Sequence, residues 1–283
     1  MTYHAPFLPR RWLLTTTLLL LTAATSHAAD AAPVAPVAPA AAHHTFVIVH
    51  GAWGGGWAFR EVDRLLTADG HMVYRPTLTG QGEKVHLATR DTNLTTHVTD
   101  IVNVILFEDL HDVVLVGHSY GGMVITGVMD RVPDRIRQVI FLDAAVPDDG
   151  ESMDSLRGNT RTREEIARGF VAPGAAAAAK PIPHDVPQPL KTWTEPVSFK
   201  NPLAQKLPGT VVVFVGKNQT PEQLKDNPSF VRARARGWAT LTLESDHNAQ
   251  WSHPKELVAL LERIADGRTR DTEERETGRT RDR

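Results

Sequence analysis

The sequence predicts an α/β fold with a doubly wound, mostly parallel sheet. Short apolar runs without alternation recur along the chain, as expected for strands covered on both faces. Helical patterns separate these runs, and strands that alternate with helices are typical of a parallel sheet. A chain of 283 residues suits one such domain and hardly two. The expected strands are 45–49, 72–75, 113–116, 139–143, 211–215 and 240–244.

Five helices are expected from apolar side chains that recur every three or four residues. Glycine or proline marks an end of most of these segments, as is usual for helices. In chain order the segments are 59–66 closed by Gly70, 94–105, 123–129 ending before Pro133, 230–236 stopped by Gly237, and a last helix opened by Pro254.

Residues 1–28 have the pattern of a secretory signal peptide. Arg10 and Arg11 precede an apolar stretch, 12–21, and small residues stand before an expected cleavage after Ala28. The stretch is shorter than the roughly 20 residues of a spanning helix, so an uncleaved membrane anchor is the weaker alternative. We expect export to the periplasm or the medium. The neighbours of the arginine pair match twin-arginine signals poorly.

Two further segments are expected to lie outside the folded domain, 43–265. Residues 29–42 hold prolines three apart among alanine and valine, which favours an extended linker. Residues 266–283 are almost all charged or small, and they are predicted to form a disordered tail.

The charge and the missing cysteines exclude several classes of protein. The formal net charge is −2, and it becomes −4 without the two arginines of the signal peptide, so neither nucleic acid nor an anionic membrane is an expected partner. The absence of cysteine excludes disulfides, thiolate metal sites and a cysteine nucleophile.

The central motif is Gly117-His118-Ser119-Tyr120-Gly121, directly after the apolar run 113–116. This G-x-S-x-G pattern between a strand and a helix is a nucleophile elbow, and it makes Ser119 the expected nucleophile. A Cβ at either glycine would crowd the strained turn. The N–H of Tyr120 lies at the helix N-terminus, where it can stabilise an oxyanion.

A second glycine-rich loop follows the first strand, from His50-Gly51-Ala52-Trp53 to Trp57. Many serine hydrolases take their other oxyanion N–H from this position, and we assign that role to Ala52. His50 is interpreted as structural, with its ring bonded to nearby backbone. Trp53 and Trp57 are interpreted as packing and pocket wall.

A serine hydroxyl needs a neighbouring base, and His247 is the expected one. It follows the last strand, at the sheet edge where Ser119 emerges. The side chain of His118 is expected to point away from the site. The usual acid position, after strand 211–215, holds no aspartate, so Asp143 at the end of strand 139–143 is the first choice, with Glu222 and Asp226 as alternatives.

Residues 147–208 break the alternation of strands and helices. They contain many prolines and the alanine run 175–179, with little clean periodicity. A segment of this size between two strands, with short helices at most, is interpreted as a lid over the site.

Together these motifs resemble the α/β-hydrolase superfamily over about residues 45–265. Within it the chain resembles small esterases grouped with plant methylsalicylate esterases and hydroxynitrile lyases, and more closely a bacterial branch that is salicylate-esterase-like or pyrethroid-hydrolase-like. Further marks of this branch are Pro76-Thr77-Leu78-Thr79-Gly80, Leu142-Asp143-Ala144 and Pro187-Gln188-Pro189-Leu190.

The resemblance implies Ser119 as nucleophile, His247 as base, and the N–H groups of Ala52 and Tyr120 as oxyanion hole. The lyases carry a threonine where this chain has Gly51 and a lysine where it has Asn248, which disfavours cyanohydrin cleavage. Related dehalogenases and epoxide hydrolases use aspartate where this chain has its serine. The chain departs from the pattern in lacking the acid after residue 215.

The expected function is therefore the hydrolysis of carboxylic esters through an acyl-enzyme, without metal or organic cofactor. The expected partner is a small, apolar ester substrate. Lactone or thioester hydrolysis and cofactor-free peroxidation would use the same triad, and a non-catalytic ligand-binding homologue is the alternative outside enzymes. Neither the natural substrate nor the oligomeric state can be deduced from the sequence.

Overall fold

The computed structural model describes residues 42–158, 161–217, 219 and 221–268. The chain divides into two units, Met1–Ala41 and Ala42–Arg283, and every element below belongs to the second. The predicted signal peptide, nearly all of the predicted linker and the last fifteen residues lie outside the described part. Among the described helices none is long and apolar enough to cross a membrane.

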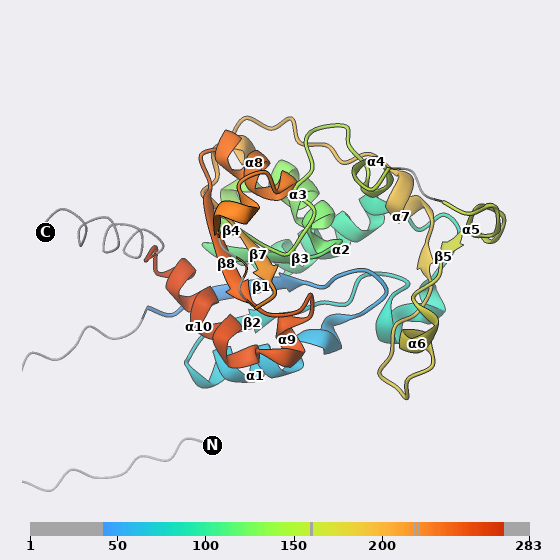
Figure 1. Ribbon diagram of the computed structural model, residues 1–283, viewed down its shortest axis with the longest axis horizontal. Coiled ribbons are helices and arrows are strands. Elements are labelled where there is room, and N and C mark those ends of the chain that lie inside the picture. The colour runs from blue at the N-terminus through green and yellow to red at the C-terminus, as the bar shows by residue number, and fades with distance from the viewer. Residues whose placement is uncertain (1–41, 159–160, 218, 220, 269–283) are drawn as a thin grey trace, which may run out of the picture. The chain divides into compact units, whose positions relative to one another are not determined.

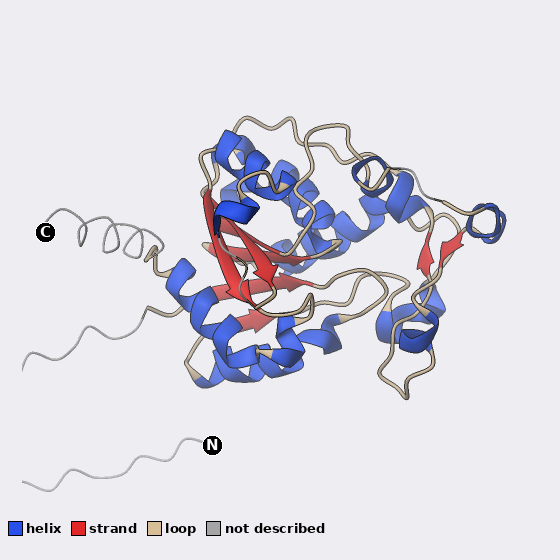
Figure 2. Cartoon of the chain, viewed as in Figure 1, coloured by secondary structure: helices blue, strands red, loops and turns tan. Residues whose placement is uncertain are grey.

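The core of the fold is a parallel sheet of six strands in the order β2-β1-β3-β4-β7-β8. Each strand was expected from the sequence, and several run further than predicted. Figure 2 shows the strands between two layers of helices. The strands are β1 Thr45–Val49, β2 Met72–Tyr74, β3 Val113–His118, β4 Ile136–Leu142, β7 Gly209–Val215 and β8 Ala239–Glu244.

Helices cover both faces of this sheet, which explains why its central strands are apolar without alternation. Alternate residues of β3 belong to different cores: Val113 and Leu115 pack on one face, Val114 and Val116 on the other. The first face is covered by α2 Leu94–Phe107, α3 Gly121–Arg131 and α8 Pro228–Ala235. The second is covered by α1 Arg60–Ala68, α9 Ala249–Ser252 and α10 Pro254–Ala265. The predicted doubly wound α/β fold is confirmed.

The strand order determines where the site lies. The chain moves outward from β1 to β2 and then returns to place β3 on the other side of β1. In such sheets the crevice beyond the carboxyl ends of the strands, where the winding direction changes, is the usual ligand site. The loop after β1 and the turn after β3 therefore meet at one edge.

The insertion, residues 147–208, lies beyond that end of the sheet (Figure 1). It contains short helices, as expected, and also a small antiparallel pair of strands that was not predicted. A two-residue strand leaves no periodicity in the sequence from which to predict it. The elements are α4 Met153–Leu156, α5 Arg163–Arg168, β5 Phe170–Val171, α6 Ala175–Ala178, β6 Gln188–Pro189 and α7 Lys191–Thr194.

Single turns of 3₁₀ helix complete the described part of the chain. They are η1 Gly56–Phe59, η2 Gly82–Leu87, η3 Pro133–Arg135, η4 Ala204–Lys206 and η5 Pro221–Leu224. At the other end, the described part includes residues 266–268 of the predicted tail, and the rest of that segment lies outside it. The Asp266 carboxylate accepts a hydrogen bond from His44 at 2.8 Å and pairs with Arg268.

Candidate active site

Ser119 occupies a strained turn between β3 and α3. Its φ is +54°, in the left-handed region that residues with side chains rarely adopt. The neighbouring glycines allow this turn to pack: a Cβ on Gly121 would lie 2.5 Å from the Val49 carbonyl oxygen, and one on Gly122 would lie 2.0 Å from that of Ala145. The turn projects the serine hydroxyl beyond the sheet edge, as the elbow motif predicts.

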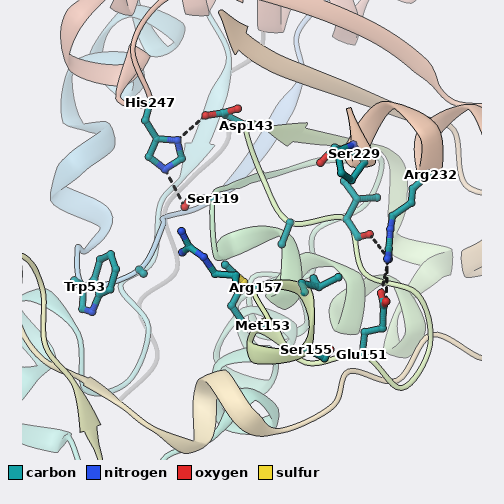
Figure 3. A pocket seen from close by; sticks show the side chains of 15 residues that line it. Trp53, Ser119, Asp143, Glu151, Met153, Ser155, Arg157, Ser229, Arg232 and His247 are labelled. Carbon is teal, nitrogen blue, oxygen red and sulfur yellow. Dashed lines mark hydrogen bonds and ion pairs between the residues drawn. The ribbon is translucent and has the colours of Figure 1, made fainter. Parts of the chain in front are cut away.

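Three side chains from different strand ends form a chain of hydrogen bonds (Figure 3). Ser119 Oγ lies 3.0 Å from His247 Nε2, and His247 Nδ1 lies 2.6 Å from Asp143 Oδ2. With the proton on Nδ1, the ring donates to the carboxylate and accepts from the serine hydroxyl. The ring can then take up the serine proton, which is the requirement for a nucleophilic serine.

Asp143 is the carboxylate that the structure joins to His247. It directly follows β4, with φ +42°, and its N–H donates to the Val212 carbonyl at 2.7 Å. Its other carboxylate oxygen is 3.4 Å from the N–H of Phe214. Asp226, one of the two alternatives, is exposed and has no hydrogen bond to His247. The side chain of Glu222, the other, lies outside the described part.

The loop after β1 lies directly against the serine. A Cβ on Gly51 would be 3.1 Å from the Ser119 Cβ, a tight contact that the glycine avoids. Within the described chain, neither the Ala52 nor the Tyr120 N–H has a hydrogen-bond partner. An oxyanion hole is built from free amide donors of this kind beside a nucleophile.

The conformation of that loop is held by the insertion through Trp53. This residue also has a positive φ, +63°. Its N–H donates to Gln188 Oε1 at 3.0 Å, its indole N–H to the Val171 carbonyl at 3.1 Å, and its carbonyl accepts from the Val186 N–H at 2.9 Å. The Ala52–Trp53 peptide, which adjoins the one that carries the Ala52 N–H, is thereby held by a contact from the insertion.

Gln188 is the buried centre of these contacts. It has no exposed surface, and its amide nitrogen donates to Thr192 Oγ1 at 2.8 Å. That hydroxyl in turn donates to the Pro189 carbonyl at 2.7 Å. The sequence analysis noted Gln188 only as part of a family motif, because a glutamine in a proline-rich segment does not by itself indicate a buried role.

His50 is structural, as predicted. Burial lowers its pKa to about 4, so the ring is neutral at neutral pH. Its Nδ1–H donates to the Gly51 carbonyl at 2.8 Å, and its Nε2 accepts the N–H of Leu78 at 3.1 Å. The ring therefore ties the loop after β1 to the loop after β2.

His118 does not point away from the site, and that expectation is wrong. Its ring packs against the His247 ring at a centroid distance of 4.7 Å, and its Nε2–H donates to the His247 carbonyl at 2.8 Å. Burial and the neighbouring His247 lower its pKa to about 4. A neutral His118 thus supports the loop that carries His247, a contact between residues 129 positions apart.

The Tyr120 side chain is buried on the opposite side of the elbow. Its hydroxyl donates to His97 Nδ1 at 3.0 Å, and His97 Nε2–H donates to the Thr79 carbonyl at 2.9 Å. Burial lowers the pKa of His97 to about 4 and raises that of Tyr120. The sequence analysis used only the backbone of Tyr120 and missed this network, whose members are far apart in the chain.

Two clefts meet at the serine. The larger has a volume of about 510 Å³ and runs toward α4 and α8; the smaller has about 420 Å³ and runs toward α6 and α9. Ala52, Trp53, Ser119 and His247 line both. Trp57, predicted as pocket wall, lines the smaller cleft and stacks on Trp251 at a centroid distance of 5.6 Å.

Fold and site together define a hydrolase of the nucleophile-elbow type, and comparison with known proteins agrees. Residues 46–260 match the α/β hydrolase family. The chain is 41% identical to a carbendazim hydrolyzing esterase of Nocardioides sp. (strain SG-4G), over 76% of this chain and 97% of that protein.

More distant relatives include a plant enzyme and a solved bacterial structure. Methylesterase 2 of Arabidopsis thaliana is 35% identical over 36% of this chain and 40% of its own length. An extracellular α/β-hydrolase from a Paenibacillus species has the same fold, with a TM-score of 0.64 and 23% identity over 81% of this chain and 100% of that one. The chain belongs to the α/β hydrolase family, and the expected class, a carboxylic-ester hydrolase, is confirmed.

Proposed function

We propose that the protein cleaves carboxylic esters with Ser119 as nucleophile, His247 as base and Asp143 as the acid that orients the base. The observation that carries this proposal is the continuous chain of hydrogen bonds, 3.0 Å and 2.6 Å long, through the imidazole. His247 removes the serine proton as Oγ attacks the ester carbonyl. The resulting imidazolium is stabilised by the carboxylate on its other side.

The tetrahedral oxyanion is assigned to the free N–H groups of Ala52 and Tyr120. When it collapses, the bond to the alcohol oxygen breaks and His247 returns its proton to the leaving alcohol. Water then attacks the acyl-enzyme, again with His247 as base, and the acid is released with Ser119 restored. Because both proposed donors are backbone groups, their positions depend on the loop conformations described above.

The two clefts support an ester in which both halves are bound. They diverge from Ser119, so the acyl group and the alcohol each have a separate space. The tryptophans of the smaller cleft favour a flat, apolar group there. Carbendazim and methyl esters, after which the two sequence relatives are named, are therefore the first compounds to test.

We also propose that the protein is exported. The basic, apolar and small-residue regions of residues 1–28 support a signal peptide, and the absence of cysteine removes any need for oxidative folding. The N-terminal sequence of the mature protein tests this proposal. A mature chain that begins at residue 29 in the periplasm or medium is expected, and an intact N-terminus in the cytoplasm would contradict it.

Release of p-nitrophenol from acetate, butyrate and octanoate esters tests the catalytic proposal. We expect turnover by the wild type and a loss by a factor on the order of 10⁶ in Ser119→Ala, because the nucleophile is removed. Ser198→Ala is the matched control, since Ser198 is exposed and bonds to Asp130. A well-folded wild type that binds these esters without a burst or turnover would contradict the proposal and favour a ligand-binding homologue.

A further inference from the structure

The larger cleft contains one arginine side chain without an ion-pair partner among the described residues. Four of the side chains that line it carry formal charge: Asp143, Glu151, Arg157 and Arg232. Asp143 is paired with His247, and Arg232 is paired with Glu151, with 2.9 Å between Nη2 and Oε1. The Arg157 side chain has no hydrogen bond or ion pair with any described residue. The formal charges of the lining sum to zero, but one guanidinium, that of Arg157, is left free to bind a ligand.

The backbone places this arginine at the end of a helix that borders the cleft. Arg157 follows α4, and its N–H donates to the carbonyls of Met153 and Asp154, which fixes its position at the helix end. Figure 3 shows its side chain pointing across the cleft toward Ser119 and Trp53. Arg157 is thus directed at the position where a bound ester would lie.

Nearby arginines of the same insertion behave differently. Arg161 pairs with Asp154 at 2.6 Å, and Arg168 pairs with Glu164 at 2.7 Å. Each of these carries its own carboxylate partner, whereas Arg157 faces a cavity. A guanidinium without a partner, beside a site for small molecules, is well suited to a carboxylate, which it can bind through two parallel hydrogen bonds.

Apolar side chains line the same cleft as Ser119 and Arg157. Ala145, Val146, Met153 and Leu156 line the cleft together with Arg157. A ligand that reaches from the serine to the guanidinium would lie along an apolar wall and end at a cation. This pattern matches an ester with an apolar spacer and a terminal carboxylate.

We propose that the substrates include esters that carry a free carboxylate, such as the monoesters of dicarboxylic acids, and that Arg157 binds this carboxylate. The inference rests on the proposed function, because it assumes that the ester carbonyl is attacked by Ser119. Arg157 is then a specificity residue for the larger cleft. It takes no part in bond making or breaking.

The test uses a matched pair of substrates, mono-p-nitrophenyl adipate and methyl p-nitrophenyl adipate, which differ in the charge of the distal group. We expect wild type to prefer the anionic ester, and Arg157→Gln to lower the anionic-to-neutral ratio of kcat/KM about fivefold, mainly through KM. Arg157→Lys should retain part of the preference, and added salt should reduce it. Arg168→Gln, in the same insertion, is the control and should leave the ratio unchanged.

A ratio that is the same in wild type and Arg157→Gln would overturn the inference while leaving ester hydrolysis intact. Binding of mono-methyl adipate to Ser119→Ala, with and without Arg157→Gln, gives a measurement that needs no turnover. Weaker binding in the double variant supports the role of Arg157, and equal binding contradicts it. Failure of the proposed function is distinct, because it would abolish turnover of both esters in the wild type.

Discussion

Three residues of the site have a left-handed backbone conformation although none is glycine. Trp53, Ser119 and Asp143 have φ values of +63°, +54° and +42°. Such conformations cost of order 1 kcal/mol or more each, and they persist where the surrounding structure holds them. Here the cost is offset by contacts from β4, β7 and the insertion. The proposed mechanism assigns the nucleophile to Ser119, the orienting acid to Asp143, and one oxyanion donor to the residue before Trp53.

At the residue scale, Asp143→Asn should lower kcat without unfolding the protein. Asparagine has the same shape and tolerates a positive φ, but it cannot stabilise the imidazolium or hold the required tautomer. We expect a loss in kcat by a factor on the order of 10³ to 10⁴. Ester kinetics combined with thermal unfolding measure both effects.

Asp226→Asn is the control for this experiment, because Asp226 was an alternative acid and is exposed. Its kinetics should equal those of the wild type. Full activity in Asp143→Asn, or a large loss in Asp226→Asn, would show that the assignment of the acid is wrong.

At the element scale, the insertion supports the loop after β1, which carries the proposed oxyanion donor Ala52. Gln188 and Trp53 are 135 residues apart in the chain, yet the Gln188 side chain accepts a hydrogen bond from the Trp53 N–H. The same insertion contributes α4 and Arg157 to the larger cleft and Lys180 and His184 to the smaller. The insertion thus shapes both halves of the binding space and fixes one proposed oxyanion donor.

Gln188→Leu should lower kcat more than it raises KM. Leucine has a similar size but offers no acceptor, which leaves the Trp53 N–H without its partner and allows the adjacent Ala52 amide to shift. Loss of alignment of one oxyanion donor costs up to about 10² in kcat. Steady-state kinetics on a p-nitrophenyl ester measures the division between kcat and KM.

Two further variants separate a role of Gln188 in positioning the loop after β1 from a general contribution to the stability of the protein. Gln188→Glu keeps an acceptor at the same place, so it should recover part of kcat. Gln205→Leu changes an exposed glutamine of the insertion that bonds to the Phe199 carbonyl, and it should have little effect. A Gln188→Leu protein that melts earlier but keeps the wild-type kcat would refute the positioning role.

At the scale of the whole molecule, the site is surrounded by neutral, buried histidines. The pKa values of His50, His97 and His118 are each lowered to about 4, with burial as the largest cause. In the unfolded chain these groups have pKa values near 6.5. Between these values the unfolded state binds more protons, so acid favours unfolding. Their contribution to stability is complete above about pH 6.5 and declines as the pH falls toward 4.

We expect the free energy of unfolding to fall by roughly 1.4 kcal/mol per pH unit for each of the three histidines in this window. Urea unfolding between pH 7.5 and 5 measures the slope. His97→Gln, which can keep both hydrogen bonds of the ring, should reduce the slope by about one third. His86→Gln, at an exposed position, should not. A stability that is flat over this range would contradict the neutral state of these histidines.

The local sequence pattern was sufficient to predict the main strands and helices and the first two proposed site residues, Ser119 and His247. Strands such as β3 and helices such as α2 are marked by the periodicity of adjacent side chains, which sequence displays directly. Ser119 is marked by its glycines, since the turn admits no larger neighbours. His247 is marked by its place after the last strand. Their proximity, 3.0 Å in the structure, follows from the rule that parallel strands end at one edge.

The remaining assignments depended on contacts that no local pattern contains. Asp143 is joined to His247 because the sheet order sets the end of β4 within reach of the loop after β8. The sequence made Asp143 the first choice but left Glu222 and Asp226 open as alternatives. The support of His247 by His118 and of Trp53 by Gln188 joins residues more than 120 positions apart.

The sequence by itself thus determined the fold class and was enough to predict Ser119 and His247 as the proposed nucleophile and base, because these follow from side-chain periodicity, from a backbone turn that only certain residues permit and from the place of His247 after the last strand. The tertiary structure decided which carboxylate is bonded to His247, which side chains hold the loop after β1, and that Arg157 in the larger cleft has no partner among the described residues. These depend on distances between segments, which are set when the sheet and the insertion pack together.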